Sequence, residues 1–213
     1  IAANPMSRLL SPVEPHPFSG LDVAWLVETR AATRRDHPFL VWEPFEGPGE
    51  TITYGEFHAR IGRIAGGLLH RGVKRGERVL IHLDNCPEAV LAWYACAWIG
   101  AVAVTTNARA AGDELAYYAG HCGAIGGITQ PKFAGLVSAN CKGLRWLSVT
   151  ATDNGAAPSR SPDSESSFAA LDGEPPPRRA PDPLAPCSVQ YTSGTTSRPK
   201  GVLWTHANAL WGA

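Results

Sequence analysis

The sequence has no excess of charge of either sign. Nineteen lysines and arginines are balanced by 19 aspartates and glutamates among its 213 residues, so the formal net charge is zero. Proteins that bind nucleic acid or anionic membrane surfaces attract them with a surplus of basic residues, and no block of like charges supplies one here. We therefore expect no nucleic-acid partner and look for function in local motifs.

Cysteines with the spacing of a metal site or of a disulfide framework are also missing. No Cys-x-x-Cys pair and no cysteine–histidine cluster with zinc spacing occurs. The five scattered cysteines are Cys86, Cys96, Cys122, Cys141 and Cys187. An odd, scattered set is typical of a reducing compartment, so we predict a cytoplasmic protein without a metal site of its own. A catalytic cysteine stays as an alternative, although no motif surrounds any of them.

We expect no signal peptide, because the start of the chain lacks that pattern. Residues 1–20 are interpreted as an N-terminal extension or an upstream remnant. The uncharged stretch 89–106 reaches the length of about 18 residues at which a membrane span is considered. It is rich in alanine, Gly100 interrupts it, and Ala101 to Thr106 form a β-type run. We expect a buried helix and then a buried strand there, and no membrane span.

Helix-like and strand-like patterns alternate over residues 21–150. A capping box at Thr53 and Glu56 predicts the start of a helix, Pro87 suits the first turn of another, and Gly100 ends that one. The expected helices cover residues 21–34, 53–72, 87–99, 113–123 and 131–140, and the expected strands cover residues 39–42, 51–53, 78–83, 101–105, 124–129 and 145–149. This alternation predicts an α/β fold, with a mostly parallel sheet flanked by helices.

Residues 151–186 differ in composition from the rest of the chain. Proline, serine, glycine and alanine dominate the segment, and large apolar residues are few. Because such a segment buries too little apolar surface to offset its chain entropy, we expect an exposed, partly disordered connection. Phe168 and Leu171 are its expected anchors.

Residues 187–213 contain the most informative segment. Tyr191 to Gly201 read Tyr-Thr-Ser-Gly-Thr-Thr-Ser-Arg-Pro-Lys-Gly, between expected strands at 188–191 and 202–204, and Thr205 is placed to cap a final helix. Glycine lets the backbone approach a ligand closely, hydroxyls and amides donate to oxygen, and lysine adds a charge suited to phosphate. The segment predicts a hairpin loop that holds a polyanion such as the phosphates of a nucleoside triphosphate.

A Walker A loop is excluded, because that pattern requires G-x-x-x-x-G-K-[ST]. After Gly194 the sequence has Pro199 where the second glycine belongs, and Gly201 follows Lys200 where a hydroxyl would hold magnesium. A plain surface turn rich in serine, threonine and glycine stays as the alternative when the segment is considered alone.

The full string resembles the phosphate-binding signature of the adenylate-forming superfamily, which includes acyl- and aryl-CoA ligases and the adenylation domains of peptide synthetases. Thr192 to Gly201 fit the pattern Ser/Thr-Gly-Ser/Thr-Thr-Gly/Ser-x-Pro-Lys-Gly, with Ser197 where glycine is commoner. The continuation fits at Val202, Thr205, His206 and Asn208. This variant is similar to the carnitine/crotonobetaine–CoA ligase branch. The resemblance extends weakly over residues 21–213 and implies an N-terminal part of the family's large domain, without the C-terminal domain.

The resemblance implies that ATP and a small carboxylic acid react to an acyl-adenylate and pyrophosphate, after which the acyl group passes to coenzyme A. Mg²⁺ would accompany ATP. Loop hydroxyls and amides would bind the β- and γ-phosphates, Gly194 would allow close approach, and Lys200 would neutralise charge. The implied phosphate-binding residues are Thr192, Ser193, Gly194, Thr195, Thr196, Ser197 and Lys200. Pro199 and Gly201 would shape the loop, and His206 is interpreted as a structural histidine rather than a base.

Two alternatives stay open at this point. One is an adenylation domain that loads a carrier protein, and the other is a truncated, non-catalytic module that binds a nucleotide or a partner. A homodimer is also left open. The catalytic residues are expected beyond residue 213.

Because members of the resembled family are more than twice as long, we expect the 213-residue chain alone to form no acyl-adenylate. The purified chain, given ATP, Mg²⁺, labelled pyrophosphate and a panel of carboxylic acids, should show no acid-dependent ATP–pyrophosphate exchange. Measurable exchange would refute this expectation.

Overall fold

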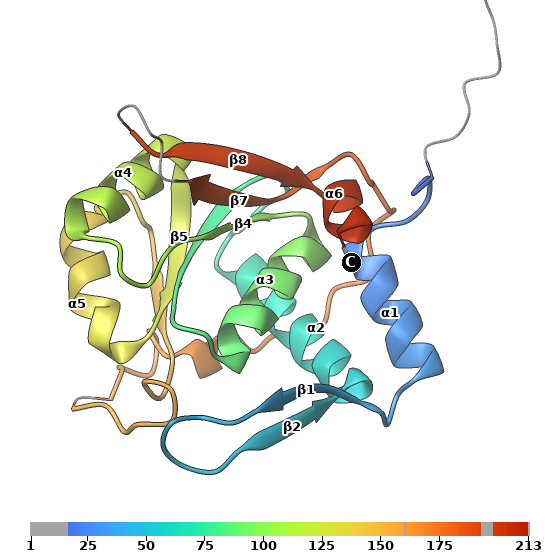
Figure 1. Ribbon diagram of the computed structural model, residues 1–213, viewed down its shortest axis with the longest axis horizontal. Helices are drawn as coiled ribbons and strands as arrows, with labels where there is room; N and C mark the ends of the chain where they lie inside the picture. Colours follow the sequence, from blue (N-terminus) through green and yellow to red (C-terminus); the bar gives the residue numbers. More distant parts are fainter. Residues whose placement is uncertain (1–16, 160, 193–197, 213) are drawn as a thin grey trace, which may run out of the picture.

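The computed structural model describes residues 17–159, 161–192 and 198–212. Its centre is a six-stranded sheet with the strand order β6-β5-β3-β4-β7-β8 (Figure 1). The strands are β3 (Arg78–His82), β4 (Val102–Thr105), β5 (Ala124–Thr129), β6 (Leu147–Val149), β7 (Pro186–Thr192) and β8 (Lys200–Thr205). Strands β3 to β7 pair in parallel, and β8 is antiparallel to β7. The predicted α/β fold with a mostly parallel sheet is confirmed.

Helices cover both faces of this sheet. They are α1 (Val23–Thr33), α2 (Tyr54–His70), α3 (Pro87–Ile99), α4 (Gly112–Cys122), α5 (Pro131–Asn140) and α6 (His206–Trp211). Neighbouring residues of a strand point to opposite faces, so Val79 joins the core with α1, α2 and α3, whereas Leu80 joins the core with α4 and α5. The chain passes from β3 to β4 through α3 and returns past β3 to β5 through α4, and right-handed crossovers place these two helices on opposite faces.

A separate hairpin of two strands, β1 (Pro38–Trp42) and β2 (Glu50–Thr53), leads into α2. The predicted capping box forms there: the Thr53 amide donates to Glu56 Oε2 at 2.8 Å, and the Glu56 amide donates to Thr53 Oγ1 at 3.2 Å. Phe39 of β1 packs on the first core, with its ring centroid 4.2 Å from that of Phe57. The capping box and this ring contact together fix where α2 starts.

The uncharged stretch 89–106 forms most of α3 and the whole of β4. The left-handed backbone of Gly100, with φ of 75°, ends the helix as the sequence predicts. Most of the stretch is buried, which confirms a buried helix followed by a buried strand. Among the described residues no helix is long and apolar enough to cross a membrane.

The connection between β6 and β7 is mostly exposed or partly exposed, and part of it is anchored to the helices. Leu171, an expected anchor, is 1% exposed. Residues 171–182, which begin with Leu171, form a strap that crosses α2. The Gly173 amide donates to Arg63 O at 3.0 Å, and Trp98 Nε1 of α3 donates to Pro176 O at 3.5 Å. Within residues 171–182 only Leu171 is buried, so the expectation of exposure fits the side chains of this strap, while its backbone is anchored on the helices by these hydrogen bonds.

Two glycines of α2 make this close crossing feasible. A Cβ atom at Gly67 would lie 2.5 Å from the Leu171 carbonyl carbon, and one at Gly66 would lie 2.3 Å from Glu174 O. Both distances are far below van der Waals contact, and both neighbours are backbone atoms that cannot rotate away. The strap and the helix therefore touch main chain to main chain.

We expect Gly67→Ala to lower the free energy of unfolding, because forcing extra volume into a packed contact usually costs about 1–3 kcal/mol. This loss should outweigh the gain of roughly 1 kcal/mol that alanine brings to a helix interior. Urea unfolding measures the net change in the free energy of unfolding. The matched control is Gly120→Ala in α4, where a Cβ atom would meet nothing within 4 Å. An equal effect of the two substitutions on stability would contradict the proposed backbone contact.

Candidate functional site

The two described ends of the signature segment lie in paired antiparallel strands, β7 and β8, as the sequence predicts. β7 pairs in parallel with β4, and β8 returns along β7 with Thr192 opposite Lys200. These two residues therefore stand at the two ends of the loop. Ser193, Gly194, Thr195, Thr196 and Ser197 lie outside the described residues, so their assignment as phosphate ligands stays a prediction.

Thr192, the last residue of β7, lies at the edge of the sheet where ligands of α/β proteins usually bind. Because β7 is parallel to β3, β4 and β5, its carboxyl end lies on the same edge as theirs. In open sheets of this type, ligands bind outside the carboxyl ends of the strands. The fold thus places Thr192 and its partner Lys200 on the expected ligand side.

Lys200 keeps its charge available at this edge. Its side chain is exposed, and within the described ranges it has no ion-pair partner. Next to it, Gly201 stands opposite Tyr191, and a Cβ atom at Gly201 would lie 3.2 Å from Val189 Cγ1 and 3.5 Å from the Tyr191 ring. Glycine at this position leaves the Tyr191 ring room to lie along β8, which is consistent with its expected part in shaping the hairpin.

Aromatic residues of α4 hold the hairpin from one side, where β7 and β8 reach that helix in Figure 1. The Tyr118 ring stacks on Tyr191 with a centroid distance of 4.3 Å, and His121 Nδ1 lies 2.8 Å from Tyr191 Oη. Burial raises the pKa of the Tyr191 phenol, so it stays uncharged. Tyr117 Oη donates to Pro199 O at 3.1 Å. Sequence analysis identifies none of these contacts, since α4 is separated from the hairpin by two strands, a helix and the strap.

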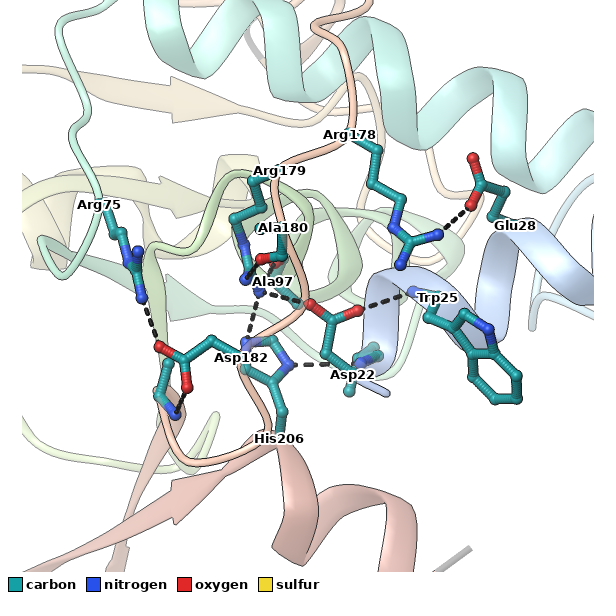
Figure 2. Close-up of polar contacts among 12 residues, drawn as sticks. Asp22, Trp25, Glu28, Arg75, Ala97, Arg178, Arg179, Ala180, Asp182 and His206 are labelled. Carbon is teal, nitrogen blue, oxygen red and sulfur yellow. Dashed lines mark hydrogen bonds and ion pairs between the residues drawn. The ribbon is translucent and has the colours of Figure 1, made fainter. Parts of the chain in front are cut away.

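The base of the hairpin is tied to the rest of the molecule by a buried polar network (Figure 2). β8 runs directly into α6, whose first residue, His206, is fully buried. Arg179 Nη2 lies 2.9 Å from His206 Nε2 and 3.0 Å from Asp22 Oδ2, while Asp22 Oδ1 accepts the Trp25 amide at 2.8 Å as the N-cap of α1. One guanidinium thus joins the strap, the start of α1 and the start of α6.

The electrostatics of this network keep His206 neutral. A guanidinium can only donate, so Nε2 of His206 has to accept, which requires an unprotonated ring nitrogen. Burial lowers the pKa of His206 to about 4, and the nearby Arg179 charge acts in the same direction. The interpretation of His206 as a structural histidine at a helix start fits this position. The N-cap expected at Thr205 is confirmed, with the Asn208 amide donating to Thr205 Oγ1 at 3.2 Å.

Two neighbouring salt bridges extend the network along the strap. Arg178 pairs with Glu28 of α1, and Arg75 Nη2 lies 2.5 Å from Asp182 Oδ2. Asp182 Oδ1 also accepts the Ala185 amide at 3.1 Å, just before β7 begins. These pairs are partly exposed and each contributes little by itself, but together they fix the path by which the strap enters β7.

The other chemically reactive side chains of the described residues point to structural roles. Burial raises the pKa of Cys86 and Cys96 to about 12 and that of Cys187 to about 11, so these thiols are not activated as nucleophiles. His82 is fully buried at the end of β3, where its Nδ1 lies 2.9 Å from Thr106 Oγ1, and burial lowers its pKa. Among the described residues, no group of three or more histidines, cysteines or carboxylates is placed to hold a metal ion.

The chain is similar to known enzymes along most of its length. The AMP-binding enzyme family matches residues 27–213. A crotonobetaine/carnitine–CoA ligase of Salmonella typhi is 32% identical over 183 residues, which cover 81% of this chain and 34% of that protein. The protein of the same name from Escherichia coli O139:H28 is 34% identical over 179 residues, which cover 79% of this chain and 33% of that protein.

Two solved structures have the same fold. A protein assigned as a long-chain-fatty-acid–CoA ligase from Rhodopseudomonas palustris superimposes with a TM-score of 0.74 at 25% identity, covering 91% of this chain and 46% of its own. An anthranilate–CoA ligase in complex with anthranoyl-AMP superimposes with a TM-score of 0.76 at 21% identity, covering 90% of this chain and 36% of its own. The chain spans about a third of the length of the curated relatives it matches.

The neutral state of His206 makes the stability of the protein depend on pH. Between the ordinary histidine pKa of 6.5 and about 4, the unfolded chain binds a proton at this residue that the folded protein does not. Stability should therefore fall as the pH is lowered through this window, with a contribution of His206 on the order of 2–3 kcal/mol. Urea unfolding at pH 7, 6, 5 and 4.5 measures it.

The variant His206→Gln keeps an acceptor for Arg179 but cannot titrate, so it should flatten this part of the pH dependence. The same substitution at His70, an exposed residue at the end of α2 for which no side-chain hydrogen bond or ion pair is found among the described residues, is the matched control. Its profile should follow that of the wild type. If the His206 variant keeps the full wild-type slope, the buried neutral histidine is not the cause.

Proposed function

The chain belongs to the AMP-binding enzyme family, and on that premise we propose that its protein is an ATP-dependent carboxylic acid–CoA ligase. The observation that carries the proposal is the signature hairpin, which presents an exposed Lys200 without an ion-pair partner among the described residues, opposite Thr192. The names of the relatives support a CoA acceptor and an acid substrate. The adenylate complex of a protein with the same fold is consistent with an acyl-adenylate intermediate.

In the proposed reaction, a carboxylate oxygen of the acid attacks the α-phosphorus of ATP, and pyrophosphate leaves with its Mg²⁺. We assign the β- and γ-phosphates to hydroxyls and amides of the loop and to the Lys200 ammonium. The phosphate ligands proposed here are Thr192, Ser193, Gly194, Thr195, Thr196, Ser197 and Lys200. Their contribution is positioning and charge neutralisation as the leaving group develops, the usual task of a protein in phosphoryl chemistry.

Mg²⁺ would enter this site as the complex with ATP. The loop offers hydroxyls, amides and an ammonium group, which suit phosphate oxygens rather than a metal ion. We also propose the cytoplasm as the compartment, where the thiols would stay reduced and where ATP and CoA are available. A homodimer stays a prediction.

The acceptor thiol is tested with the protein at full length. ATP, Mg²⁺ and a panel of carboxylic acids that includes betaines, fatty acids and aryl acids are supplied with either CoA or a carrier protein. Formation of an acyl-CoA thioester supports the proposal. Acyl transfer to the carrier protein without thioester formation on CoA would favour a synthetase adenylation domain, and no adenylate with any acid would favour a non-catalytic module.

We expect Lys200→Ala in the full-length protein to weaken adenylate formation by about 2–4 kcal/mol, the scale of one lost contact to a transition-state charge. This corresponds to a loss of about 30- to 1,000-fold in kcat/KM for ATP, measured by pyrophosphate release. Lys142→Ala is the matched control, since Lys142 is exposed and, within the described part of the chain, its ammonium donates only to Ser138 O of α5. An unchanged rate in the Lys200 variant would remove this lysine from the proposed role.

A further inference from the structure

The hairpin that carries the proposed phosphate loop is held by α4 at both of its limbs. The incoming limb is the end of β7, at Tyr191, and the outgoing limb is formed by Arg198 and Pro199, just before β8. Because the same helix touches both limbs, their separation is set from outside the loop as well as by the pairing of Thr192 with Lys200.

The incoming limb is held mostly through its aromatic ring. Tyr191 stacks on Tyr118, and its hydroxyl lies 2.8 Å from His121 Nδ1 and 3.3 Å from Tyr118 O. These contacts involve one residue immediately before Thr192. They fix the place where the chain leaves the sheet to form the loop.

The outgoing limb is contacted by Tyr117. Its hydroxyl donates to Pro199 O at 3.1 Å, and the Arg198 guanidinium carbon lies 5.5 Å from the centroid of its ring. Pro199 has no amide hydrogen to donate to a neighbouring strand, and Arg198 is exposed. The next residue along the chain is Lys200, the proposed phosphate-binding cation.

We propose that Tyr117 is a positioning residue for the pyrophosphate portion of a nucleoside triphosphate, a role that rests on the proposed function of the loop. Its hydroxyl fixes the Pro199 carbonyl and thereby the direction in which the chain enters Lys200. Its ring holds the Arg198 charge beside the loop by a cation–π contact. A limb that is already ordered loses less conformational entropy when the ligand binds, so the affinity for the phosphates rises without a direct contact from Tyr117.

The variant Tyr117→Phe isolates the hydroxyl, because it keeps the ring that faces Arg198. Loss of one hydrogen bond of ordinary strength should raise the Kd for MgATP and for Mg-pyrophosphate about fivefold. Tyr117→Leu removes the ring as well, and its effect should be larger. The Kd for AMP, which lacks the outer phosphates, should stay at the wild-type value in both variants. Isothermal titration calorimetry on the full-length protein measures all three ligands.

The matched control is Tyr94→Phe, the same substitution on α3, where the tyrosine packs against Phe39 and Phe57 on the other face of the sheet. It should leave all three dissociation constants unchanged. With an acid substrate, the KM for ATP should rise in Tyr117→Phe while the KM for the acid stays constant. The thermal midpoint of each variant is recorded alongside.

The outcomes separate this inference from the proposed function. A wild-type protein that binds neither MgATP nor Mg-pyrophosphate rejects both. If the wild type binds them and Tyr117→Phe binds them equally well, the positioning role alone is wrong. An equal loss of affinity for AMP and for pyrophosphate in the Tyr117 variants also overturns it, because such a loss reports general damage to the fold.

Discussion

The parallel pairing of β7 with β4 is the constraint on which the rest of this structure depends. β6 lies at one edge of the sheet, and β7 has to join β4 on the other side of β3 in the same direction. A tight turn cannot connect parallel strands, so a long crossing segment is required. The strap makes that crossing over α2 by main-chain contact at Gly66 and Gly67. The proline-rich strap therefore contacts α2 through main-chain atoms rather than through large apolar side chains.

The same pairing determines on which side of the sheet β7 ends, and which residues contact the other end of the β7–β8 hairpin. The carboxyl end of β7 faces the ligand edge, and β8 carries the chain back to α6. At that point Arg179 links the strap to Asp22 and His206. A buried guanidinium that loses one of these partners is left with uncompensated charge or an unmade hydrogen bond. The path of the strap, the start of α1 and the base of the hairpin are therefore interdependent.

Much of this arrangement was predictable from sequence, and the rest was not, for physical reasons. The capping box at Thr53, the proline at the start of α3 and the left-handed Gly100 are local signals. The helices whose ends they mark, α2 and α3, are confirmed. The signature of the family is also contiguous in sequence, so the sequence alone could reveal it, and the family is confirmed. Arg179 and His206 are 27 residues apart, and Tyr117 and Pro199 are 82 apart. Only the fold brings such pairs together, so no local sequence pattern predicts their contacts.

The chemistry of the contacts around the hairpin follows from the task proposed for the loop. A loop that binds a polyanion has to leave its hydroxyls, amides and cations free, so it cannot use them to hold itself in place. The groups that restrain such a loop therefore have to belong to residues outside it, and these groups should carry no charge. A carboxylate at the position of Tyr117 would pair with Arg198 or Lys200 and reduce the positive charge offered to phosphate. A phenol restrains the Pro199 carbonyl and faces Arg198 through its ring without neutralising either cation.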